Sequence, residues 1–236
     1  CNVVLNTIAA EAFKEACDRL EAAEDFDMAV HDLIKEYATQ HQRIVFNGNG
    51  YAPEWEKEAR RRGLPVLTSM VDAIPALTTD KAVELFGEFG VFTKTELESR
   101  AEIQYEIYAK AINIEAKTMV DMATKQIIPA VIKYTTVLAE SINQVKAVGP
   151  IDVSVQMDLL KKASKLLKEV NSTMNKLSKL IDQIETHPEG RDRAVFCREK
   201  LVPAMEKLRE PVDELEMLVD KDMWPMPSYG DLVFEP

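Results

Sequence analysis

Residues 160–184 read LKKASKLLKEVNSTMNKLSKLIDQI, and their apolar side chains recur at alternating intervals of three and four residues. This is the heptad spacing of a helix that packs along one seam. The seam positions are Leu160, Ala163, Leu167, Val170, Met174, Leu177, Ile181 and Ile184. The same spacing returns at Leu201, Met205, Leu208, Val212, Leu215 and Val219. Because a turn sequence at 187–190 separates the two segments, they are predicted to form an antiparallel hairpin over residues 152–221.

The charges of the two arms are complementary in this register. The first arm carries Lys161, Lys162, Lys165 and Lys168, and the second carries Glu206, Glu210, Asp213, Glu214 and Glu216. Folding back near residue 188 places these groups opposite each other, although each exposed pair contributes little stability.

The longest helical pattern runs from about residue 95 to 147. Thr93 and Glu96 have the spacing of a capping box at its start. Pro129 lacks an N–H group and is predicted to kink the helix. Apolar residues line two faces, with Tyr105, Tyr108, Ile112 and Met119 on one and Ile103, Ile107 and Ile114 on the other. We therefore expect a central helix that is buried from both sides and carries the hairpin.

Shorter elements are predicted before it. The apolar periodicity indicates helices over 2–24 and 27–42, followed by a short β or loop element near 43–51. That element combines the β-prone run Arg43–Phe46 with the turn sequence Gly48-Asn49-Gly50. The remaining segments are a helix from Pro53 to Gly63, an irregular stretch over 64–78 and a helix over 80–88. The predicted fold class is mainly α, with long antiparallel helices in a bundle that includes the coiled-coil-like hairpin.

The composition excludes several functional classes. A net charge of −11 argues against binding to nucleic acid or to an anionic membrane. The apolar runs are shorter than the ~20 residues of a membrane-spanning helix. Cys1, Cys17 and Cys197 form no CxxC pair, which favours a reducing cytoplasm, and Cys17 is expected to pack on a helix face. Because the helical pattern begins almost at Cys1, we expect the chain to be cut from a longer protein.

No motif in the sequence predicts an active site. The Gly48-Asn49-Gly50 turn lacks the third glycine of a dinucleotide-binding loop, so a structural turn is favoured. His31, His41 and His187 lack the glutamate three residues earlier that a di-iron helical bundle requires. We therefore predict no catalytic, cofactor-binding or metal-binding residue in this chain.

Several longer strings resemble the C-terminal region of type III glutamine synthetases. They are Leu5–Glu11, Phe46–Tyr51, Asp72–Leu77, Ile112–Ala116, Lys125–Ala130 and Met223–Leu232. The similarity covers nearly the whole chain and is least clear over 148–195. Strings of this length, in this order, are more specific than any short motif.

The resemblance implies a cytoplasmic ligase that joins ammonia to glutamate, with ATP and Mg²⁺ or Mn²⁺ bound in the full-length enzyme. It also implies a homo-oligomer, built in that family from stacked hexameric rings. By the same resemblance, 1–78 closes the catalytic domain and 79–236 is a helical extension. No position matches the family's catalytic motifs, so this chain is expected to be a structural and assembly region that is inactive by itself.

Two other functional classes stay open at this stage, a free-standing helical interaction module without enzyme activity and a metalloenzyme helical bundle. Within the leading hypothesis, the hairpin is predicted to be a docking arm between subunits. Its candidate contact residues are apolar positions outside or beside the seam, namely Leu159, Leu166, Leu180 and Leu218.

Overall fold

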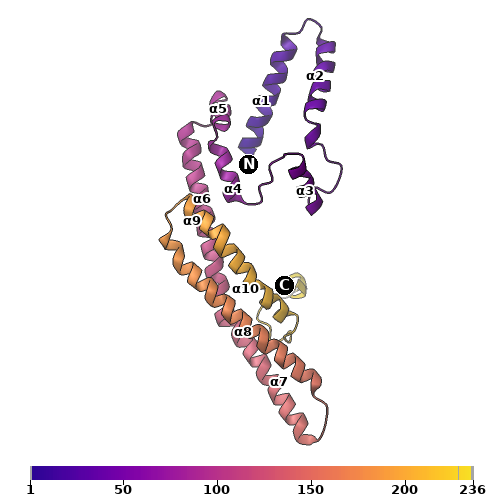
Figure 1. Cartoon of the computed structure of the whole chain (residues 1–236), viewed down its shortest axis with the longest axis vertical. Coiled ribbons are helices and arrows are strands. Elements are labelled where there is room, and N and C mark those ends of the chain that lie inside the picture. The colour runs from indigo at the N-terminus through magenta and orange to yellow at the C-terminus, as the bar shows by residue number, and fades with distance from the viewer. Residues whose placement is uncertain (1, 228, 235–236) are drawn as a thin grey trace. The chain divides into compact units, whose positions relative to one another are not determined.

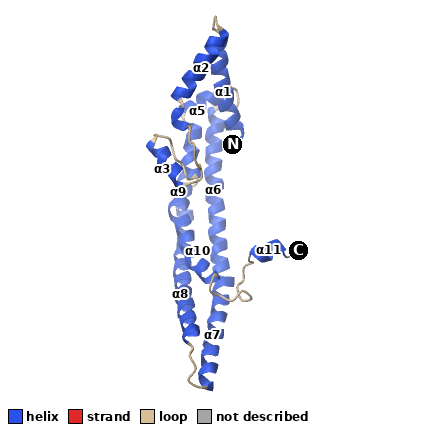
Figure 2. Ribbon diagram, turned by 90° about the vertical axis from the view of Figure 1, so that its right-hand side faces the viewer, coloured by secondary structure: helices blue, strands red, loops and turns tan. Residues whose placement is uncertain are grey.

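The computed structural model describes residues 2–227 and 229–234, and within these ranges it contains helices and loops but no strand (Figure 2). The chain divides into two compact units, Cys1–Glu102 and Ile103–Pro236. No helix in the described ranges is long and apolar enough to span a membrane. The elements of the first unit are α1 (Asn2–Glu21), α2 (Phe26–Gln40), η1 (Gln42–Ile44), α3 (Pro53–Arg61), α4 (Met70–Ala73), η2 (Ile74–Thr78), α5 (Asp80–Glu88) and the start of α6 (Lys94–Met122).

The first unit has a small core. The helices α1 and α2 contact each other, and α1 also contacts α5. Asp25 caps α2 by accepting a hydrogen bond from the Met28 N–H at 3.1 Å, which explains the predicted break at this residue. Cys17 is exposed, so the prediction that it packs on a helix face was wrong. The buried residues are Thr7, Leu33, Ala59, Val71, Ile74, Phe86, Leu97 and Ala101.

The β-prone run Arg43–Phe46 does not form a strand. It starts in the 3₁₀ turn η1 and continues as a loop, so the element predicted near 43–51 is a loop element. Arg62 Nη1 donates hydrogen bonds to the main-chain carbonyls of Arg43 at 3.1 Å and Val45 at 2.7 Å. The Arg62 side chain therefore pairs with two main-chain carbonyl groups of this run. In a strand, the N–H groups of a neighbouring strand would pair with them.

The segment 64–78 is more ordered than predicted. Ser69 caps the short helix α4, and Pro75 lies in the first turn of the 3₁₀ helix η2, where a missing N–H is tolerated. The predicted helices that begin at Pro53 and near residue 80 are confirmed as α3 and α5.

The capping box that opens α6 is confirmed. The Thr93 N–H donates to Glu96 Oε2 at 2.7 Å, and the Glu96 N–H donates to Thr93 Oγ1 at 3.3 Å. The bond from the Thr93 main chain lowers the pKa of the Glu96 carboxyl. The carboxylate and hydroxyl thus occupy N–H groups that the first turn of a helix leaves unpaired.

Only one face of α6 is buried in the second unit, so the prediction of burial from both sides was wrong. Tyr105, Ala109 and Ala116 are at most 4% exposed. The opposite face carries Ile103, Ile107 and Ile114, which are 50%, 57% and 65% exposed. The sequence placed apolar residues on both faces, but periodicity cannot tell whether a face has a neighbour.

The distortion predicted at Pro129 takes the form of a π-turn. The π-turn η3 (Ala123–Ile127) lies between α6 and α7 (Ile128–Val148), and the Ile128 N–H bonds to the Ala123 carbonyl. The second arm repeats the device, since the π-turn η5 (Cys197–Leu201) precedes Pro203 at the same spacing. A proline ring collides with the carbonyl four residues earlier in an α-helix, and the wider turn relieves that collision.

The predicted hairpin is present and packs on α7. Its first arm is α8 (Ser154–Gln183), continued by η4 (Ile184–Thr186), and α8 contacts both α7 and α10 (Figure 1). The second arm consists of α9 (Arg191–Phe196), η5 and α10 (Val202–Glu216), and α11 (Tyr229–Phe234) follows near the C-terminus. Lys162 Nζ lies 3.8 Å from Glu214 Oε2 across the hairpin, in the predicted register.

Every seventh seam position is buried in both arms. The residues Ala163, Val170, Leu177, Ile184, Leu201, Leu208 and Leu215 are at most 2% exposed. The alternate seam positions Leu160, Leu167, Met174 and Ile181 are half-buried. The heptad spacing therefore predicted the line of contact correctly. Only the tertiary structure shows which seam positions are fully buried and which are half-buried.

Candidate functional site

The described residues 2–227 and 229–234 hold no group of three or more histidine, cysteine, aspartate or glutamate side chains placed to share a metal ion. Each of the three histidines has a different local partner. His31 Nδ1 lies 3.3 Å from Asp32 Oδ1 on an exposed surface. The His41 ring meets the Tyr37 ring edge-on, and the His187 ring stacks on Phe196 with a centroid distance of 4.0 Å.

The Gly48-Asn49-Gly50 segment is a structural turn. Asn49 Oδ1 accepts a hydrogen bond from the Tyr51 N–H at 3.0 Å, which closes a side-chain turn. A Cβ atom at Gly48 would lie 2.6 Å from the Phe46 ring, so a larger residue would require that ring to move. The glycine serves close packing here.

Arg193, near the start of α9, ties together the turn between the two arms. Its Nε and Nη2 donate to the main-chain carbonyl of His187 at 3.2 and 3.0 Å. Its Nη1 lies 3.4 Å from Glu185 Oε2 and 3.6 Å from Glu189 Oε1. Gly190 completes the turn with a φ of +82°, a conformation that favours glycine. The Arg193 side chain, which is 18% exposed, therefore holds three residues of the turn. We call this arrangement of Arg193 with Glu185, His187 and Glu189 the clasp.

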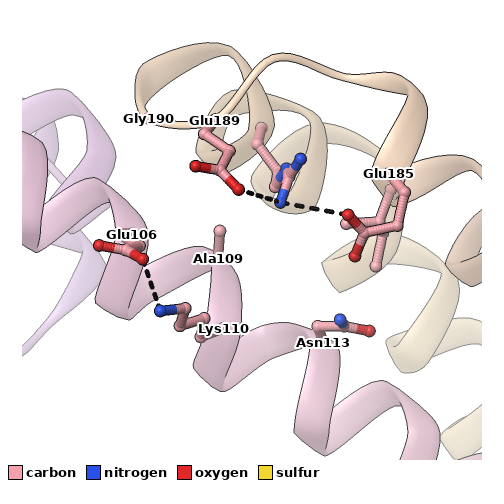
Figure 3. A pocket seen from close by; sticks show the side chains of 9 residues that line it. Glu106, Ala109, Lys110, Asn113, Glu185, Glu189 and Gly190 are labelled. Atoms are coloured by element: carbon pink, nitrogen blue, oxygen red, sulfur yellow. Dashed lines mark hydrogen bonds and ion pairs between the residues drawn. The ribbon is translucent and has the colours of Figure 1, made fainter.

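A cavity of about 110 Å³ lies between this turn and α6 (Figure 3). On the α6 side, Lys110 Nζ lies 2.5 Å from Glu106 Oε1. This hydrogen bond lowers the pKa of the Glu106 carboxyl and raises that of the Lys110 ammonium. Asn113 Oδ1 is buried in the same wall without a partner among the described residues. Each charged group that lines the cavity is paired with another, so none of them is free to act as a general acid or base.

A larger groove, of about 770 Å³, lies in the first unit between α1, η2 and α5. Lys14 Nζ lies 2.6 Å from Glu88 Oε1 at one side, and this hydrogen bond raises the pKa of Lys14. Glu11 Oε2 is buried without a partner among the described residues. Most of the lining is apolar and includes Val4, Ile8, Leu77, Leu85 and Phe86. The groove has the character of a contact surface.

The four leucines that the sequence suggested for subunit contacts differ in their exposure. Leu166 is 4% exposed, so it is packed inside this chain and is not available to a neighbour. Leu159, Leu180 and Leu218 are half-buried. Because α8 packs against α7 as well as α10, a residue flanking the seam can be buried by a third helix. No sequence motif indicated the roles of Arg193, whose partners lie in the adjacent turn, or of Trp224, which lies beside residues distant in the chain.

Comparison with known proteins gives one consistent result. A family model described as the glutamine synthetase C-terminal domain matches residues 29–146. A type-3 glutamine synthetase of Dictyostelium discoideum is 32% identical over 98% of this chain and 33% of that protein. Glutamine synthetases of Butyrivibrio fibrisolvens and Bacteroides fragilis are 34% and 30% identical, over 87% and 94% of the chain and 29% and 31% of those proteins. The chain thus spans about a third of the length of these curated relatives.

From the clasp we predict that Arg193→Lys destabilises the fold. A lysine has no planar fork with which to hold the His187 carbonyl and both carboxylates, so the free energy of unfolding should fall by about 1–3 kcal/mol. Urea denaturation followed by circular dichroism measures the change. Arg209→Lys is the matched control, because Arg209 is 74% exposed and pairs with Asp213 four residues on. Its effect should stay within about 0.5 kcal/mol, and equal losses in the two variants would contradict the clasp.

Proposed function

The chain belongs to the glutamine synthetase C-terminal domain family, and on this premise we propose that it is the C-terminal structural and assembly region of an ATP-dependent glutamate–ammonia ligase. The relatives are about three times as long as the matched segment, so the ligase activity is proposed for the whole protein. We assign 1–78 to the close of its catalytic domain and 79–236 to a helical extension. In this proposal the described residues of the chain support the chemistry from outside the active site.

The observation that carries the proposal is the exposure of apolar side chains on the first two helices. Phe13 is 72% exposed and Leu5 is 63% exposed, while Thr7 is the one buried residue of α1. We name the α1–α2 apolar surface by its large exposed residues, Val3, Leu5, Ile8, Phe13, Phe26, Met28 and Ile34. Large apolar side chains exposed in this number on two helices that contact each other are typical of a contact that another polypeptide segment covers.

The free energy that would be gained by burying the α1–α2 apolar surface favours a permanently bound segment on it. Burial of a large apolar side chain contributes about 1.5–3 kcal/mol, so the α1–α2 apolar surface together offers on the order of 10 kcal/mol. The small core of the first unit leaves this surface in water. We therefore propose that it packs against the catalytic part of the same enzyme chain, which the length of the relatives accommodates.

The cofactors follow from the same assignment. We propose that ATP and Mg²⁺ or Mn²⁺ bind in the catalytic part of a cytoplasmic enzyme, and that none is held by this chain alone. Such an enzyme depends on a connected scaffold, because catalytic groups must be held within a fraction of an ångström of their productive positions. The scaffold role requires that the α1–α2 contact be kept during turnover.

We also propose that the enzyme is a homo-oligomer and that the hairpin 152–221 reaches a neighbouring subunit. The contact is assigned to the connection between α7 and the first arm of the hairpin, where Val148, Ile151 and Val155 are 80%, 52% and 68% exposed. Leu159 lies one helical turn beyond Val155 and can extend this contact. Leu166 is excluded by its burial, whereas Leu180 and Leu218 stay as secondary candidates.

The first expectation concerns the chain by itself. The purified 236-residue chain should show no γ-glutamyl transfer, because it lacks the catalytic motifs of the family. The assay compares it with a mock preparation from cells without the gene. γ-Glutamyl transfer above that background would contradict the proposal that the catalytic residues lie in the rest of the enzyme.

The second expectation concerns the α1–α2 apolar surface in the full-length enzyme. Replacing Leu5 and Phe13 with aspartate should reduce ligase activity at least about tenfold, because two charges would be desolvated at the contact. The same pair in the isolated chain should leave its helicity unchanged, since both positions are exposed.

Ile107→Asp with Ile114→Asp provides the matched control, because these α6 residues are 57% and 65% exposed. Activity of the control should stay near that of the unmodified enzyme. Full activity in the Leu5 and Phe13 variant would contradict docking through this surface.

The third expectation concerns assembly. Val148→Glu combined with Val155→Glu should leave the subunit folded and shift sedimentation of the full-length enzyme to smaller species. A parallel variant, Leu180→Glu with Leu218→Glu, tests the positions that the sequence favoured. Unchanged sedimentation of the first variant, at unchanged helicity, would rule out the connection between α7 and the hairpin as the docking contact.

A further inference from the structure

The outer face of α8 carries a row of lysines. Lys161, Lys165 and Lys168 lie at intervals of four and three residues, and all three are exposed. A helix turns by about 100° per residue, so these side chains share one face, opposite the buried seam positions Ala163 and Val170. We call the three residues the lysine row. The helix holds six lysines and three acidic residues in a chain of net charge −11, so the row is a locally positive surface.

The outer face of α10 carries negative charges at the same spacing. Glu206, Glu210 and Asp213 also lie at intervals of four and three residues, and all three are exposed. They lie opposite the buried seam positions Leu208 and Leu215. We call these three residues the acidic row. Two helices that lie side by side through the two rows would bring three positive charges within reach of three negative ones.

The two rows cannot pair with each other inside one chain. The helices α8 and α10 contact each other along their seam and lie side by side in Figure 1. Because each row faces away from the seam, the two rows lie on opposite sides of the hairpin. Between the lysines of α8 and the acidic residues of α10, the described part of the chain contains one ion pair, from Lys162 Nζ to Glu214 Oε2. Both of its members lie outside the two rows.

The charges of the two rows are available to a partner. Lys161, Lys165 and Asp213 each have an ion-pair partner in their own helix, at 3.7, 3.8 and 3.1 Å. Exposed pairs of this kind contribute little stability, so a partner can replace them at small cost. The other three members of the two rows have no ion pair with residues 2–227 or 229–234. Each row therefore keeps charge that the chain itself does not neutralise.

We propose that the lysine row of one copy of this chain binds the acidic row of a second copy. The proposal rests on the proposed homo-oligomer and adds a contact separate from the connection between α7 and the hairpin. Because the two rows lie on opposite sides of the hairpin, the contact is heterologous and repeats from copy to copy. A second copy is favoured over a polyanion because it presents charges at the matching spacing, whereas a net charge of −11 repels a polyanion.

Charge reversal in the full-length enzyme tests the contact. One variant reverses the lysine row and a second reverses the acidic row, namely Lys161→Glu, Lys165→Glu and Lys168→Glu in the first, and Glu206→Lys, Glu210→Lys and Asp213→Lys in the second. Either variant alone places like charges on both sides of the contact. The dissociation constant for subunit association, measured by sedimentation, should therefore rise at least about tenfold. Circular dichroism should show unchanged helicity, because all six positions are exposed.

A mixture of the two variants separates this contact from a folding defect. The lysine row of the first variant is then acidic and meets the acidic row of the second, which is then basic. The unmodified rows of the two variants also match each other. Copies that alternate along the assembly thus meet opposite charges at every contact, so association in the mixture should be at least about tenfold tighter than in either variant alone.

The matched control reverses three exposed lysines of α6 and α7, with Lys94→Glu, Lys117→Glu and Lys133→Glu. It changes the net charge as much as reversal of the lysine row does, and it should leave association unchanged. Unchanged association in either row variant, an equal loss in the control, or no recovery on mixing would overturn the proposed contact. An unmodified enzyme that sediments as a single subunit would contradict the homo-oligomer as well, whereas an oligomer that ignores both reversals would remove this contact alone.

Discussion

Burial of the apolar seam between α8 and α10 is the interaction on which the second unit depends. Residues at intervals of seven lie on one line along each arm, and these positions are at most 2% exposed. The pair Lys162–Glu214 lies across the two arms in the register that this seam defines. The clasp at Arg193 closes the end where the chain turns.

The helix α8 has a second partner, and this explains the rest of the unit. α8 contacts α7 as well as α10, and Leu166, which lies beside the seam of α8, is 4% exposed. Prolines would normally disrupt such long helices. Pro129 and Pro203 each follow a π-turn by the same interval, so the chain keeps its helical direction while avoiding the carbonyl clash. The π-turn η3 also lines one wall of a cleft to which Leu208 and Trp224 contribute.

The first unit has the opposite character. Asp25, Ser69 and Thr79 cap α2, α4 and α5, yet much of the apolar surface of the unit faces solvent, and its core consists of a few side chains. Local interactions are enough to specify the helices, whereas stability requires packing of their apolar faces. We infer a scaffold whose second unit is held by its own seam and whose first unit is completed by the rest of the enzyme. The family relationship and the exposed α1–α2 apolar surface support the same assignment.

The sequence by itself determined the long helices, the capping box of α6 and the hairpin. Heptad spacing, the Thr93–Glu96 box and the Pro53 start each depend on residues close in the chain, so local chemistry was sufficient. Other features required the tertiary structure. Periodicity could not show that Ile107 is exposed while Leu166 is buried, because both lie on apolar faces and only the position of a neighbouring helix distinguishes them. The Trp224 cleft is likewise formed by segments more than 80 residues apart, and the burial of its indole N–H follows from their packing.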